Sequence, residues 1–181
     1  MGDSRGVAIT LNNLGTLALV QGEYGRAATL GEEALSLLRA LGDKDVTAAI
    51  DTVARAALQA GNPRRAADLY AGGITVSRAA GDRELIAFCL QGIGRVAAEE
   101  GKMERATTLY AAGEALRTAV GAPLSPSEMP QQEASLHAAR VGLGEEVFAR
   151  VWDSGMSMDL EAAISFAREE DGSVPVRVKD E

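Results

Sequence analysis

Apolar side chains recur along most of the chain at the spacing of amphipathic helices. Near the N-terminus they form two stripes at i, i+3, i+4 and i+7. The first stripe comprises Leu11, Leu14, Ala18 and Leu19, and the second comprises Ala27, Leu30, Ala34, Leu35 and Leu38. The segment QGEYG between them is polar and contains two glycines, so it interrupts the pattern. The pattern therefore predicts two antiparallel helices joined by a short turn.

This two-helix pattern occurs three times. Aligning Gly22, Gly61 and Gly101 brings the flanking residues into register at spacings of 39 and 40 residues. Matching positions carry Arg26, Arg65 and Arg105, then Leu30, Leu69 and Leu109, then Gly42, Gly81 and Gly121. A period of about 40 residues is typical of helical solenoids. We therefore expect a repeat domain over residues 1–123, with units at about 7–43, 46–82 and 86–122.

The turns between the helices carry recognisable end signals. In AGNPR, Asn62 is placed to cap a helix and Pro63 to occupy its first position, where a missing N–H costs nothing. The exits ALGD and AAGD offer Gly42 and Gly81 for a left-handed residue after the last helical turn. Each unit is then a helical hairpin that buries its apolar faces only against neighbours. The predicted fold class is an all-α solenoid.

The repeat ends after residue 123, and residues 124–170 are predicted to form a helical capping segment. Ser125-Pro126-Ser127-Glu128 fits a capping box, so a helix should start near Pro126 and include Pro130 in its first turns. A second helix is predicted over GEEVFARVWDSG, and a third over LEAAISFARE with Ser157 or Asp159 as its cap. Residues 171–181 are expected to be a disordered tail.

The repeat units resemble tetratricopeptide (TPR) repeats. Leu14-Gly15, Ala18 and Ala27 stand at the signature spacing, as do the corresponding small residues of the later units with Tyr70 and Tyr110. The large aromatic of the first helix and the closing proline are missing, and the period exceeds the usual 34. The longer period and the C-terminal segment resemble the TPR-like arrays of large bacterial LuxR/MalT-type ATP-dependent regulators. The resemblance implies a right-handed solenoid with a concave ligand groove.

Composition narrows the classes of partner. The formal net charge is -8, which disfavours direct binding of nucleic acid or of an anionic membrane surface. No apolar run is long enough to span a bilayer. The single cysteine, Cys89, forms no internal disulfide and suits a reducing cytoplasm. Because 15 of the 18 basic residues are arginine, a GC-rich bacterial source is favoured.

No arrangement of residues predicts catalysis, so we expect the protein not to be an enzyme and to need neither a cofactor nor a metal. GIGRVA, at residues 92–97, matches a dinucleotide fingerprint but falls inside a predicted helix, where a phosphate-binding loop is impossible. His137 is the only histidine, which leaves no histidine-based metal site or Ser–His relay. Cys89 lacks a neighbour that would favour its thiolate, so a buried, inert thiol is expected.

The TPR resemblance places a ligand groove on the first helix of each unit. Its polar candidate residues are Asn12, Thr16, Asp51, Arg55, Gln59, Gln91, Arg95 and Glu99. Two interpretations of Arg55 and Arg95 remain open. Their guanidinium groups could together bind a carboxylate or phosphate of a ligand. Alternatively, Asp51 pairs with Arg55, and Glu99 with Arg95, each within one helix at i,i+4.

The leading functional hypothesis is a non-catalytic binding module. By resemblance it is the sensor or scaffold segment of a bacterial signal-transduction or transcriptional regulator, binding a protein, a peptide or a small-molecule effector in the groove. The alternative is a free-standing TPR adaptor for protein–protein or self-association. Gly2-Asp3 aligns with Gly42-Asp43, which predicts the end of a truncated repeat before the first unit. The first helix would then expose an apolar face, through which a homodimer could form.

Overall fold

The protein is all-helical in the part of the chain that the computed structural model describes, residues 3–122 and 129–169. The helices there are α1 (Ser4–Val20), α2 (Tyr24–Leu41), α3 (Val46–Gln59), α4 (Pro63–Ala80), α5 (Arg83–Glu99), α6 (Met103–Val120), α7 (Met129–Leu143), α8 (Glu145–Met156) and α9 (Leu160–Arg168). The described residues contain no strand, which confirms the predicted all-α class. The predicted capping box at 125–128 and tail at 171–181 lie outside the described residues.

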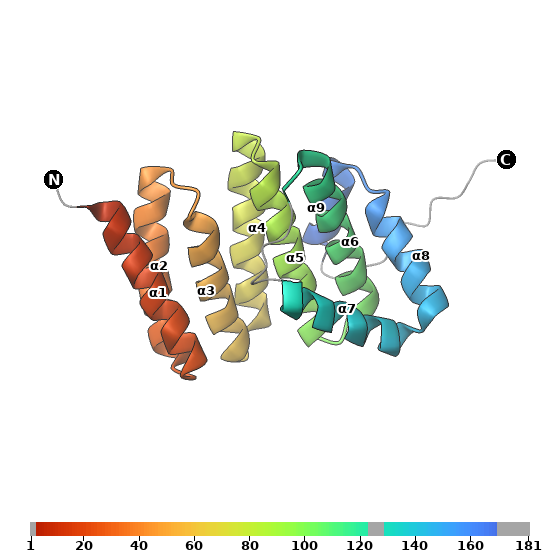
Figure 1. The fold of residues 1–181 in the computed structure, drawn as a ribbon, viewed down its shortest axis with the longest axis horizontal. Coiled ribbons are helices and arrows are strands. Elements are labelled where there is room, and N and C mark those ends of the chain that lie inside the picture. Colours follow the sequence, from red (N-terminus) through yellow and green to blue (C-terminus); the bar gives the residue numbers. More distant parts are fainter. Residues whose placement is uncertain (1–2, 123–128, 170–181) are drawn as a thin grey trace.

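Helices α1 to α6 stand in a row, each packed against the next (Figure 1). Within this row α3 also contacts the next helix but one on each side, α1 and α5. We refer to α1, α3 and α5 as the odd-numbered row. At the C-terminal end α7 and α8 pack on α6, while α9 lies behind α6 in Figure 1 and contacts α4, α5 and α6. In the described part of the chain, α6 thus packs against α5, α7, α8 and α9, whereas the main contacts of α1 are with α2 and α3.

The turn signals operate as predicted. Gly42, Gly81 and Gly121 end α2, α4 and α6 with φ of 62°, 72° and 68°, in the left-handed region that glycine adopts without strain. Asn62 caps α4 by accepting a hydrogen bond from the Arg65 N–H at 3.1 Å, and Pro63 occupies the first helical position. Of the two proposed caps for α9, the structure selects Asp159, whose carboxylate accepts from the Ala162 N–H at 2.8 Å.

Missing side chains allow neighbouring helices to approach closely. A methyl group added to Gly31 of α2 would lie 2.7 Å from Cγ2 of Val53 in α3. A methyl group added to Gly92 of α5 would lie 2.4 Å from the Tyr70 ring of α4. In the α2/α3 interface the glycine belongs to the earlier helix, α2. In the α4/α5 interface it belongs to the later helix, α5. At both positions the neighbouring side chain fills the space that glycine leaves.

The C-terminal helices are attached by specific contacts. Gly155 of α8 lies against α6, where a methyl group would come within 2.4 Å of the Thr108 carbonyl oxygen. Arg105 of α6 donates to the carbonyl oxygens of Phe166 and Ala167 at 2.9 and 3.0 Å, so it caps the C-terminal end of α9. Phe166 itself is buried in the main core. Helix α9 is therefore part of the main hydrophobic core.

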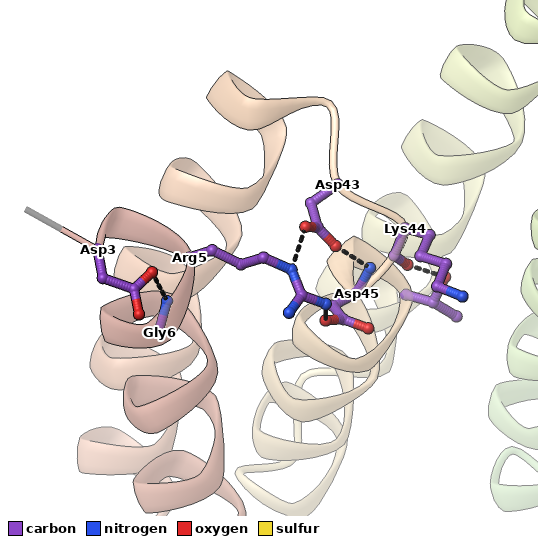
Figure 2. A network of polar contacts seen from close by, with 7 residues as sticks. Asp3, Arg5, Gly6, Asp43, Lys44 and Asp45 are labelled. Carbon is purple, nitrogen blue, oxygen red and sulfur yellow. Dashed lines mark hydrogen bonds and ion pairs between the residues drawn. The ribbon is translucent and has the colours of Figure 1, made fainter.

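A polar network holds the start of α1 against the turn between α2 and α3 (Figure 2). Arg5 Nε donates to Asp43 at 2.6 Å, and its Nη2 donates to Asp45 at 2.5 Å. Asp43 also accepts from the Asp45 backbone N–H at 2.9 Å. Asp3 caps α1 through the Gly6 N–H, also at 2.9 Å. Together these contacts fix the position of α1 on the neighbouring hairpin.

Candidate functional site

The best-defined polar cluster lies where α3, α4 and α5 meet, and it is centred on the Asp51 carboxylate. Tyr70 of α4 donates its hydroxyl to Asp51 Oδ1 at 2.8 Å, and Arg95 of α5 donates from Nη2 to the same oxygen at 2.9 Å. The second oxygen, Oδ2, lies 3.6 Å from Nη1 of Arg55 in α3. One carboxylate thus lies within ion-pair distance of two guanidinium groups. Among the described residues, neither arginine forms an ion pair with any other acid.

Arg95 is held more firmly than Arg55. Its side chain is only 17% exposed, and its guanidinium carbon lies 6.0 Å from the centre of the Tyr70 ring. Burial opposes its charge, but the Asp51 carboxylate, with Tyr70 and Tyr110, keeps the Arg95 pKa above its ordinary value. Phe88 packs edge-on against Tyr70 with ring centres 6.0 Å apart. Arg95 is therefore a fixed cation in a partly desolvated setting.

Arg55 is the accessible member of the pair. Its side chain is 39% exposed, and its contact with Asp51 at 3.6 Å exceeds hydrogen-bond length. A guanidinium group has five N–H donors. Because Asp51 is already occupied by Tyr70 and Arg95, most donors of Arg55 are available to solvent or to a ligand. We call Asp51, Tyr70, Arg55 and Arg95 the Asp51 cluster.

The structure distributes the predicted groove residues unequally. Asn12 and Gln91 are at least partly covered by the rest of the protein. Gln91 is buried beside Gly113 of α6, and Asn12 is half-buried. Buried polar atoms without a partner occur at both, Oδ1 of Asn12 and Nε2 of Gln91. Thr16, Gln59 and Glu99 are exposed on α1, α3 and α5. Only Asp51, Arg55 and Arg95 are brought into one cluster.

The structure bears on the i,i+4 interpretation of the two arginines, whereas the ligand-binding interpretation stays a prediction. Asp51 approaches Arg55 within α3, as the i,i+4 interpretation predicted. Arg95, in contrast, pairs with Asp51 of α3 across 44 residues of sequence, whereas Glu99 had been its expected partner. The sequence interpretation also missed Tyr70 as a member of the cluster. The sequence did contain a signal for Tyr70. It lies nine residues after Gly61, in the second helix of the hairpin whose first helix carries Asp51.

Two hollows lie elsewhere on the surface. One, of about 320 Å³, lies between α4, α5 and the end of α9, and its lining includes Arg64, Asp68, Lys102, Arg105 and Glu169. The other, of about 300 Å³, lies between α7 and α8 beside Leu136, His137, Arg140 and Trp152. Arg140 covers the Phe148 ring at 4.4 Å, and Phe148 stacks on Trp152. Both hollows mix charges of both signs and define no single ligand chemistry.

The remaining sequence candidates are Cys89, His137 and the GIGRVA segment. Cys89 is fully buried in α5, and burial raises the pKa of its thiol to about 12. His137 is exposed on α7, and the GIGRVA segment lies entirely within α5. Within residues 3–122 and 129–169, no three His, Cys, Asp or Glu side chains are grouped to hold a metal ion. No helix in the described part of the chain has the length and apolarity needed to cross a membrane.

Comparisons with protein-family models, with curated proteins and with solved structures found no match.

Proposed function

We propose that the chain is a non-catalytic, TPR-like binding module that recognises an acidic group of a protein, peptide or small-molecule partner through Arg55 and Arg95. In this proposal the helical hairpins form a right-handed solenoid with a period of about 40 residues, and the odd-numbered row lines its concave side. The module would serve as the sensor or scaffold segment of a cytoplasmic bacterial regulator of the LuxR/MalT type. That wider role rests on the resemblance of the repeat units alone.

One observation carries the proposed ligand class: a single carboxylate, Asp51, is shared by two arginines. Locally, the cluster has one more positive charge than negative, although the whole chain has a formal net charge of -8. Arg95 is positioned by Asp51 and Tyr70, so it loses little side-chain entropy when it binds a ligand. Arg55 presents an exposed planar fork suited to a carboxylate or phosphate. A carboxylate bridging both arginines would balance the cluster.

The test is binding of an N-acetylated tetraglutamate peptide, measured by calorimetry at low ionic strength, where screening is weak. The proposal predicts saturable binding that Arg55→Ala abolishes while the melting temperature stays nearly unchanged. Arg55→Lys, which keeps the charge but loses the fork, should bind more weakly than the wild type. Arg26→Ala is the matched control, because it removes an equally charged, exposed side chain from α2. Equal affinity of the wild type and Arg55→Ala would refute the proposed site.

A second candidate function is a free-standing adaptor for protein–protein or self-association. The observation that favours it is the apolar, exposed side of α1, which carries Val7, Leu14, Leu17 and Val20. Exposed apolar surface that is contiguous along a helix marks an interaction site more often than single exposed residues do. Sedimentation of the intact chain over a range of concentrations distinguishes a self-associating adaptor from a monomeric module.

A further inference from the structure

The exposed side of α1 is unusual among the odd-numbered helices. Residues 6–21, which cover nearly all of α1, contain no charged residue. Leu17 is 52% exposed and Leu14 is 40% exposed. A helix side that faces only water normally carries charged residues. The Arg5 contacts with Asp43 and Asp45 connect the start of α1 to the turn between α2 and α3 (Figure 2).

The later hairpins show what covers the same positions. Counted back from the left-handed glycines Gly22 and Gly61, Leu14 corresponds to Val53 and Leu17 to Ala56. Val53 and Ala56 are 0% and 1% exposed in α3, which packs against the preceding helix α2. The corresponding Ile93 and Val96 are each 4% exposed in α5, which packs against the preceding helix α4 and also against α9. In both copies of this surface the preceding helix, α2 or α4, therefore packs against the helix that carries it.

The covering helices share a pattern. Both α2 and α4 have 18 residues and bury five positions at the same spacing. These positions are Ala27, Gly31, Ala34, Leu35 and Leu38 in α2, and Ala66, Tyr70, Gly73, Ile74 and Ser77 in α4. Alanine or glycine occupies the first and third positions, and a branched aliphatic residue occupies the fourth. Small residues let the backbones approach, and in α2 the second position is small as well, because Gly31 lies over Val53.

We infer that the exposed side of α1 is a docking surface for a partner helix with the α2/α4 pattern: about five turns, small residues at the first and third buried positions, and leucine or isoleucine at the fourth. This inference concerns α1 alone and does not depend on the Asp51 cluster. A second copy of the chain fits less well. Face-to-face pairing would oppose Leu14 and Leu17 to each other, and the α1 glycines are turned elsewhere, Gly15 towards Thr52 and Gly6 towards Asp3.

The experiment uses the whole chain and a labelled peptide with the sequence of residues 23–42, which carries the α2 pattern in full. Fluorescence anisotropy should show saturable binding to the wild type, with a gain of peptide helicity in circular dichroism. Leu17→Asp should weaken binding at least about tenfold, because it places an unpaired charge in the contact. Val76→Asp is the matched control, since Val76 is also an exposed aliphatic residue, 62% exposed on α4 against 52% for Leu17 on α1. A peptide carrying Leu35→Asp should bind as poorly as the Leu17→Asp protein does.

Three results would overturn the inference: no saturable binding to the wild type, equal binding to Leu17→Asp, or equal binding of the Leu35→Asp peptide. The same holds if sedimentation shows a dimer that Leu17→Asp converts to monomer while the peptide fails to bind, because the second copy would then be the occupant. Thermal unfolding of each variant verifies that Leu17→Asp remains folded. Leu17→Ser, a smaller change at the same position, provides the comparison if it does not. Failure of this test leaves the acidic-peptide test at Arg55 unaffected.

Discussion

Arg95 Nη2 and Asp51 Oδ1 lie 2.9 Å apart, although the two residues are separated by 44 positions in the sequence. The bond links α3 to α5 across the intervening α4, whose Tyr70 hydroxyl donates to the same oxygen. Because both partners are largely shielded from water, the contact contributes to stability, whereas the longer, exposed Arg55 contact contributes little. This difference separates the two arginines experimentally.

Arg95→Met is therefore expected to lower the free energy of unfolding by about 1.5 to 3 kcal/mol, the range for a hydrogen bond to a charged group. Arg55→Ala should change it by less than about 0.5 kcal/mol, as for most exposed substitutions. Chemical denaturation of the two variants and the wild type measures both values. Equal destabilisation by the two substitutions would contradict the different roles given to the two side chains.

Gly92→Ala should destabilise the protein by about 1 to 3 kcal/mol, because the new methyl group would lie 2.4 Å from the Tyr70 ring. Gly72→Ala is the matched control. Gly72 also lies inside a helix, but a methyl group there meets no atom within 4 Å. It should stabilise by up to about 1 kcal/mol through helix propensity. Tyr70→Leu combined with Gly92→Ala should recover part of the loss, and melting curves of the four proteins test the contact.

Cys89 should be unreactive towards a thiol reagent in the native protein near pH 8. Burial, with smaller contributions from Asp82 and Asp51, raises the pKa of its thiol to about 12, so almost no thiolate is present and the sulfur is covered. Reaction with Ellman's reagent should require unfolding and become complete in denaturant. Rapid labelling of the folded chain would show that α5 is not packed as described.

The network at the start of α1 should make stability depend on pH in the acid range. The backbone N–H of Asp45, and then Arg5, lower the pKa of the Asp43 carboxyl below its ordinary value of 3.8. A lowered folded-state pKa stabilises the protein above the ordinary value, and this stabilisation is lost as the pH falls through the lowered one. Wild-type melting temperatures should therefore fall more steeply below about pH 4 than those of Asp43→Asn. Asp153→Asn, at an exposed position of α8, is the matched control.

Local signals in the sequence predicted the local structure. Asn62, Pro63, Gly42 and Asp159 act at helix ends, and each needs only neighbours within a few residues to do so. Apolar spacing likewise predicted the helices of the first hairpin, α1 and α2.

Contacts between hairpins were not predictable in the same way. The i,i+4 rule gave Arg95 a partner in its own helix, Glu99, although the folded chain brings Asp51 closer. Likewise, the glycine of the α2/α3 interface is Gly31 on the earlier helix, and that of the α4/α5 interface is Gly92 on the later helix. The neighbouring helix supplies the large side chain in each case. Such choices are made by packing in three dimensions, which one sequence does not display. Gln91 is an example: the sequence predicts it in the groove, but it lies buried against α6.

The most direct test of the central claim is to map tetraglutamate binding residue by residue, by recording amide chemical shifts of the labelled protein during a titration at low ionic strength. We expect the shifts to concentrate on α3 and α5 around Arg55 and Arg95, and to disappear in Arg55→Ala. Shifts centred on another surface, such as the α4–α9 hollow beside Arg64, or unchanged shifts in Arg55→Ala, would contradict this expectation.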